Sequence, residues 1–129
     1  MLAVDTNIIV RYLTNDDPQQ SSVARRLVDR QEVWVPTTVL LETEWVLRSV
    51  YRYKHAQIRA ALRRFAGLPL VTLENAPLCA QALDWVEHGM DFADALDLGA
   101  SGYCEEFVTF DANFAKAAKK AHAGNVRIP

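Results

Sequence analysis

The chain has 129 residues, of which 50% are hydrophobic, and its formal net charge is −2. This length fits one domain, and the apolar content is enough to bury a core without disulfide support. The near-neutral charge excludes a basic field over the whole surface, so any binding of nucleic acid must depend on local patches.

The sequence contains no apolar run long enough to span a bilayer. The N-terminal apolar run has no basic segment before it and is interrupted by Asp5, so we expect neither a membrane span nor a signal peptide. The two cysteines, Cys79 and Cys104, lack the spacing of a metal finger. A reduced, cytoplasmic protein is the simplest interpretation.

The first predicted element is a short buried strand that ends at Asp5. Helical apolar spacing follows, and we expect Thr6 or Asn7 to cap this helix. An acid at the carboxyl end of a first strand lies at the mouth of a sheet, where open α/β folds bind ligands. The alternative is that Asp5 is itself the N-cap of the helix.

Helices and short strands alternate along the rest of the chain. Pro18 indicates the start of a second helix, and Pro36 closes a strand over 32–36. Thr37 or Thr38 is expected to cap the next helix, which carries Glu42 in its first turns. The remaining elements are predicted as helix 56–65, strand 68–73, helix 75–88, helix 90–100 capped by Asp91, strand 107–111, helix 112–121 and edge strand 126–128.

This alternation predicts an α/β fold, a three-layer sandwich around a mostly parallel sheet of about four to five strands. We expect a single domain over residues 1–129, because the sequence contains no repeat, low-complexity segment or linker. In the second helix we expect Val23 to face inward, and the apolar positions of the helix that carries Glu42 include Trp45 and Val50.

Charge is distributed unevenly along the chain. Residues 45–73 contain no acid, residues 74–111 contain nine acids and no Lys or Arg, and the chain is basic again after Asp111. Solvated helix faces explain most runs of this kind. The functional interpretation is a phosphate-binding surface around an acidic centre that holds metal ions.

Two strands that lie far apart in the sequence each end in an acid, Asp5 and Asp111. Strand ends of the same polarity lie at one edge of a parallel sheet, and the helices that carry Glu42 and Asp94 begin at that edge. We therefore expect these four carboxylates to converge. At about 5 Å and an effective dielectric constant near 20, each pair repels by roughly 3 kcal/mol.

Raised pKa values, basic partners or cations must offset this repulsion. None of the four acids has a Lys or Arg next to it in sequence. Ligation by carboxylate oxygens suits Mg²⁺ or Mn²⁺, whereas zinc favours Cys and His. Each acid also has a structural interpretation: Asp5 and Asp111 as helix caps, Asp94 as the partner of Asp91 in a capping box, and Glu42 as a surface residue.

Four short motifs resemble those of PIN-domain nucleases, in the same order. They are Val-Asp-Thr-Asn at 4–7, Val-Leu-Leu-Glu at 39–42, Asp-Phe-Ala-Asp-Ala-Leu at 91–96 and Val-Thr-Phe-Asp-Ala-Asn-Phe at 108–114. Within that family, the chain is most similar to the small toxin subunits of bacterial type II toxin–antitoxin modules of the VapBC kind. The match covers nearly the whole chain.

This resemblance implies a ribonuclease that uses Mg²⁺ or Mn²⁺ to cut RNA, and a homodimer that a cognate antitoxin protein inhibits. Its metal site would consist of Asp5, Glu42, Asp94 and Asp111. Asn7 resembles a residue that orients Asp5 or a bound water, and Thr109 a hydroxyl residue that supports the last acid. Asp97 stands where the family varies, and it is either an additional supporting carboxylate or solvent-exposed.

The expected reaction is hydrolysis without a protein nucleophile, in which one of the four carboxylates accepts a proton from water. Arg11, on the helix after Asp5, either points toward a phosphate or lies on the surface. One rival is a phosphatase with Asp5 as nucleophile, but Asn7 occupies the place of its second acid. The other rival is a non-catalytic module whose acidic segment binds a basic partner.

Overall fold

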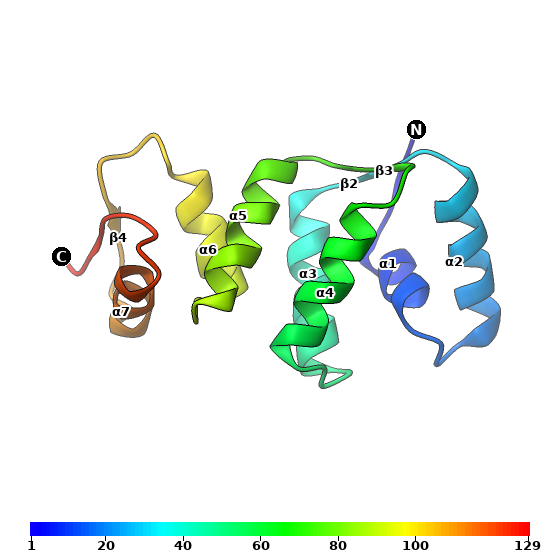
Figure 1. Cartoon of the computed structure of the whole chain (residues 1–129), viewed down its shortest axis with the longest axis horizontal. Coiled ribbons are helices and arrows are strands. Elements are labelled where there is room, and N and C mark those ends of the chain that lie inside the picture. Colours follow the sequence, from blue (N-terminus) through cyan, green and yellow to red (C-terminus); the bar gives the residue numbers. More distant parts are fainter. The chain divides into compact units, whose positions relative to one another are not determined.

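The computed structural model describes every residue, 1–129. The chain forms two compact units, Met1–Ala76 and Pro77–Pro129, and each is described by itself. The elements, most of which are labelled in Figure 1, are β1 (Leu2–Ala3), α1 (Thr6–Leu13), α2 (Pro18–Arg30), β2 (Val33–Val35), α3 (Thr37–Ser49), α4 (His55–Ala66), β3 (Val71–Leu73), α5 (Ala76–Glu87), α6 (Phe92–Ala100), β4 (Phe107–Val108), α7 (Ala112–Lys120) and β5 (Val126–Arg127).

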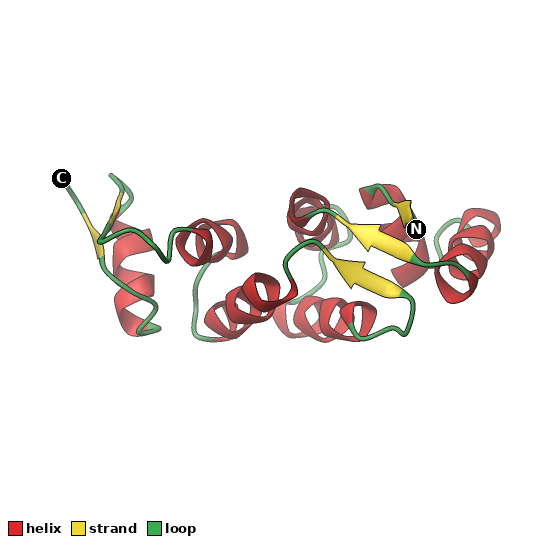
Figure 2. Cartoon of the chain, turned by 90° about the horizontal axis from the view of Figure 1, so that it is seen from above, coloured by secondary structure: helices red, strands yellow, loops and turns green.

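The first unit contains a parallel sheet of three strands in the order β1-β2-β3. Figure 2 shows β2 and β3 as neighbouring arrows that point the same way. In register, Ala3 lies opposite Trp34, which lies opposite Thr72. All three strands therefore end at the same edge, where the chain continues into α1, into α3 and, after Glu74, into α5.

Helices α1, α2, α3 and α4 form the rest of this unit. The α1 helix contacts both α2 and α3, while α4 contacts α3 and β3. Each helix buries an apolar stripe at helical spacing, and β2 is buried almost completely because helices and strands surround it. The most deeply buried side chains of this core are Ile9, Val28, Val33, Val35, Leu40, Leu47, Leu62 and Phe65.

The second unit contains a sheet of two parallel strands, β4 and β5, with α7 packed on β5. Phe107 of β4 stacks on Phe114 of α7 with ring centroids 5.0 Å apart. Gly99 of α6 lies against α5 so closely that a Cβ atom there would be 2.5 Å from Leu78 Cδ1. Other buried side chains are Cys79, Ala82, Leu83, Phe92, Ala95 and Ala118.

The α/β class and the parallel strands are confirmed, but the sheet is smaller than expected. The five strands are hydrogen-bonded as one sheet of three and one of two, not as one sheet of four to five. The strands are also short. Since β1, β4 and β5 have two residues each, they form few hydrogen bonds with neighbouring strands. None of the helices has the length and apolar character that a membrane-spanning segment needs.

Two predicted helix caps are wrong. Asp5 is the N-cap of α1, which confirms the alternative interpretation of this residue, and neither Thr6 nor Asn7 caps the helix. Pro36 occupies the N-cap position of α3 and gives it no side-chain hydrogen bond, so neither Thr37 nor Thr38 caps that helix. The helix start predicted at Pro18 and the cap predicted at Asp91 are both confirmed, since α2 begins at Pro18 and the Asp91 side chain caps α6.

Val23, which is predicted to face inward, is instead on the surface, and the apolar residues Trp45 and Val50 are exposed too. Val23 is 52% exposed, Trp45 53% and Val50 62%. On α3 the inner face includes two polar residues, Thr43 and Glu44, which displace Trp45 to the outside. These two are satisfied locally: Thr43 donates to the Val39 carbonyl at 2.7 Å, and Glu44 accepts from Arg48 at 2.7 Å.

Candidate functional site

Asp5 lies where β1 ends and α1 begins. The preceding N–H, of Val4, still pairs with the Trp34 carbonyl of β2 at 3.2 Å. One carboxylate oxygen of Asp5 accepts a hydrogen bond from the Thr6 N–H at 2.7 Å, which caps the helix. The cap uses one oxygen of the carboxylate, so the same residue can offer its other oxygen to a ligand.

Glu42 comes from α3, the helix that follows β2. The first N–H group of α3, on Thr37, donates to the Glu74 carboxylate at 2.9 Å, so a residue after β3 fixes the start of the helix. Glu42 is exposed on this helix, whereas Glu44 is buried in an ion pair with Arg48. Of these two acids, Glu42 and not Glu44 lines the pocket that Asp5 lines.

Asp5 and Glu42 line one pocket of about 280 Å³, together with Asn7. Asn7 makes no hydrogen bond to Asp5, so no direct contact supports its expected role in orienting that acid. Thr6 lines the same pocket, and its hydroxyl is buried without a hydrogen-bond partner. An unpaired buried hydroxyl is costly, and a bound water or ligand oxygen in the pocket would satisfy it.

In the second unit, Asp94 lies in the first turn of α6, and its N–H donates to the Asp91 side chain at 3.1 Å. The pKa of Asp94 is raised to about 6, first by burial and then by the nearby carboxylates of Asp91, Asp111 and Asp97. None of these causes is a cation. The fold therefore gathers negative charge around a partly buried acid, and Asp94 forms no ion pair with a Lys or Arg.

Asp111 caps α7 in the same unit. One of its oxygens accepts hydrogen bonds from the N–H groups of Asn113 at 2.9 Å and Phe114 at 3.1 Å. The Thr109 hydroxyl accepts a hydrogen bond from the Asp111 N–H at 3.0 Å, so Thr109 holds the backbone from which this acid projects. Asp97 is exposed, one turn along α6 from Asp94.

The four predicted acids therefore fall into two pairs, one in each unit: Asp5 with Glu42, and Asp94 with Asp111. No group of three or more His, Cys, Asp or Glu side chains in residues 1–129 is arranged to hold a metal ion. The meeting of all four acids stays a prediction.

The sequence does not predict a hydrogen-bonded network that lies at the edge of the pocket of Asp5 and Glu42. Arg11, which lines that pocket, bonds to Asp16 and to the Tyr51 hydroxyl. Nothing in the local pattern around Tyr51 indicates this partner, because residues 16 and 51 meet only through the packing of α1 against α3. The Asn-Asp-Asp-Pro turn at 15–18 was a signal for a helix start alone.

A family model described as the PIN domain matches residues 2–120. The chain belongs to the PIN domain family.

Two solved structures are similar to this chain. VapC20 of Mycobacterium tuberculosis, described as a toxin that cleaves the sarcin-ricin loop, is 25% identical, with 91% of this chain and 95% of that chain covered and a TM-score of 0.43. VapBC2 of Rickettsia felis bound to a DNA fragment from its promoter is 14% identical, with 98% and 97% covered and a TM-score of 0.38. No curated protein matches the sequence.

Proposed function

We propose that this chain is a metal-dependent endoribonuclease, a single PIN-like nuclease domain over residues 1–129 that hydrolyses RNA phosphodiester bonds. The observation that carries the proposal is the charge around Asp94, whose pKa is raised to about 6 by burial and by three carboxylates. In a PIN domain, such uncompensated charge is what a cation site requires.

The donor atoms present fit Mg²⁺ or Mn²⁺. The proposed ligands, Asp5, Glu42, Asp94 and Asp111, supply oxygen only, and the unpaired Thr6 hydroxyl adds a further oxygen beside the first pair. Hard divalent cations prefer such ligands, and neither Cys79 nor Cys104 is near them in sequence. When bound, the ion would activate water and stabilise negative charge on phosphate oxygens.

The chain's own residues prepare this site. Helix-capping hydrogen bonds hold Asp5 and Asp111 in fixed orientations, and Thr109 fixes the backbone of Asp111. Preorganised side chains of this kind lower the cost of binding a cation and of orienting a phosphate. Asp97, one helical turn from Asp94, adds to the negative charge around Asp94.

Cleavage assays test the proposal directly. The purified chain is incubated with a structured RNA and Mg²⁺ or Mn²⁺, beside Asp94→Asn, a chelator control and the matched control Glu87→Gln on the exposed end of α5. We expect cleavage that needs the metal, is lost in Asp94→Asn and persists in Glu87→Gln. Cleavage that survives both the chelator and Asp94→Asn contradicts the metal-dependent function.

Two other outcomes would point to the rival functions. Hydrolysis of a small phosphomonoester without RNA cleavage would favour a phosphatase with Asp5 as nucleophile. Neither activity, combined with tight binding to a neighbouring-gene product, would favour a non-catalytic binding module.

We further propose that the chain is the toxin of a VapBC-type pair and works in the cytoplasm as a homodimer. The motif resemblance supports this, and the surplus of acids over residues 74–111 suits a basic antitoxin segment, because Arg pairs bidentately with carboxylates. Co-expression with the neighbouring-gene product is expected to suppress cleavage. Light scattering of the isolated chain is expected to give twice the mass of one 14.5 kDa chain.

A further inference from the structure

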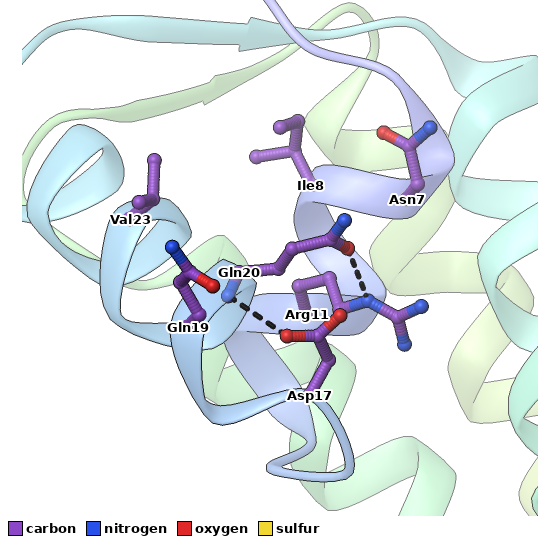
Figure 3. A pocket seen from close by; sticks show the side chains of 7 residues that line it. All are labelled: Asn7, Ile8, Arg11, Asp17, Gln19, Gln20 and Val23. Atoms are coloured by element: carbon purple, nitrogen blue, oxygen red, sulfur yellow. Dashed lines mark hydrogen bonds between the residues drawn. The ribbon is translucent and has the colours of Figure 1, made fainter.

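The guanidinium of Arg11 is held from several sides. Its Nε donates to Gln20 at 2.8 Å, as Figure 3 shows, and its Nη1 donates to Asp16 and to the Tyr51 hydroxyl, both at 3.0 Å. The Tyr51 hydroxyl donates to the other oxygen of Asp16 at 2.7 Å, and Thr14 donates to Asp16 at 3.0 Å. These bonds fix the orientation of the guanidinium.

One nitrogen of the Arg11 guanidinium, Nη2, has no hydrogen-bond partner in the structure, although the Arg11 side chain is only 29% exposed. The two N–H groups of Nη2 can donate to a phosphate oxygen, and a hydrogen bond between a charged donor and an anion is stronger than one between neutral groups.

Arg11 also lies beside the acids of the candidate site. It lines the pocket of Asp5 and Glu42, and it is the only cationic side chain that does so. It also borders a second pocket of about 680 Å³ between α1 and α2, shown in Figure 3 with Asn7 and Gln20. Asn7 borders both pockets and lies four residues before Arg11, on the same face of α1.

We propose that Arg11 binds a backbone phosphate of the substrate beside the Asp5–Glu42 pocket, and that Asp16 and Tyr51 are positioning residues that aim its guanidinium. The inference rests on the proposed function, since it assigns a residue to the binding of the same RNA. A purely structural role explains the network less well: Tyr51 and Thr14 already hold Asp16, and an exposed ion pair adds little stability.

Binding measurements test this assignment without any cleavage. A fluorescently labelled single-stranded RNA is titrated with the full chain in Ca²⁺, between about 50 and 200 mM salt. Arg11→Gln is expected to weaken binding about tenfold and to reduce the slope of log affinity against log salt by about 0.7, the value for one phosphate contact on a single strand. Arg26→Gln, which removes an exposed arginine of α2, is the matched control.

Two further variants separate charge from orientation. Arg11→Lys keeps the charge, so we expect it to retain the salt slope but not the full affinity, because an ammonium group cannot reproduce the planar set of donors that binds Gln20, Asp16 and Tyr51. Tyr51→Phe is expected to weaken RNA binding with an unchanged salt slope, because Arg11 keeps its charge but loses the Tyr51 hydroxyl that fixes the orientation of its guanidinium. These variants decide the question if Arg11→Gln does not fold, since a purely structural Arg11 predicts the same RNA affinity in every folded variant.

The outcomes distinguish this inference from the proposed function. If Arg11→Gln binds RNA as Arg26→Gln does, or cleaves it with an unchanged KM, the inference is overturned while the nuclease assignment stands. If the wild-type chain binds RNA through Arg11 but cleaves none, the phosphate site stands and the nuclease assignment fails. A wild-type chain that binds no RNA overturns both.

Discussion

The Tyr51 hydroxyl donates a 2.7 Å hydrogen bond to Asp16, joining the segment after α3 to the turn between α1 and α2. This hydrogen bond is the largest cause that lowers the pKa of Asp16, and bonds from Thr14 and the charge of Arg11 act in the same direction. Because Tyr51 lines the pocket of Asp5 and Glu42, the bond links the edge of that pocket to the turn between α1 and α2.

Tyr51→Phe is expected to lower the Tm by about 3 °C, because it removes one hydrogen bond to a charged acceptor and leaves the ring contacts in place. Since the pKa of Asp16 is lowered in the folded state, this stabilisation is present above the ordinary aspartate pKa of 3.8 and is lost as the pH falls further, through the folded-state pKa. Thermal melts over this pH range measure the difference. Tyr103→Phe, at a fully exposed ring, is the control and should leave the Tm unchanged.

Glu74 has a comparable role at the start of α3. Its carboxylate accepts from the Thr37 N–H at 2.9 Å, and α3 has no other side-chain cap. We expect Glu74→Ala to cost on the order of 1 kcal/mol, the usual effect of removing an N-terminal cap, and Glu74→Gln to cost less because it keeps an acceptor. Urea unfolding measures both. Equal losses in the two variants would show that the charge of Glu74, not its acceptor, stabilises the helix.

The elements of this fold were largely predictable from sequence, because proline, apolar spacing and capping residues act locally. Pro18 and Asp91 start helices where expected. Tertiary contacts decide the rest: the cap of α3 comes from Glu74, which lies 37 residues away, and Trp45 is exposed because Thr43 and Glu44 take the inner face.

In the candidate site, too, only the residues that belong to local motifs were predictable. The motifs indicated Asp5 and Glu42, which share a pocket, and Asp94 and Asp111, which interact electrostatically. Local motifs contain no information on the network around Arg11, because Tyr51 is 40 residues away from it in the sequence.

The raised pKa of Asp94 makes stability depend on pH. The folded-state pKa of Asp94 is about 6, above the ordinary value of 3.8, so folding favours its protonated form. The contribution of this proton to the stability of the folded state is complete below about pH 4 and is lost as the pH rises through 6. Asp94→Asn is therefore expected to stabilise the protein above pH 6, by about 1 kcal/mol after allowance for solvent screening, and to have no effect near pH 4. Melts in metal-free buffer at both ends of this range test it, and a constant difference would contradict the assigned pKa.

A divalent cation should reverse that effect. If Mn²⁺ binds among the predicted acids, it stabilises the folded state by about 2.7 kcal/mol at a concentration one hundred times its Kd. We expect Mn²⁺ to raise the Tm of the wild type and of Glu87→Gln but not of Asp94→Asn. A chelator should remove the increase. The same shift in all three proteins would place the cation elsewhere.

Asp111 allows its structural and functional roles to be separated. Its carboxylate caps α7 through the Asn113 and Phe114 N–H groups, at 2.9 and 3.1 Å. Asp111→Asn keeps an oxygen acceptor, so we expect nearly unchanged stability, whereas Asp111→Ala loses the cap and costs about 1 kcal/mol. Both variants lack the negative charge, so both should lose metal-dependent RNA cleavage. An Asp111→Asn variant that cleaves RNA as fast as the wild type would reduce Asp111 to a helix cap and remove it from the proposed metal site.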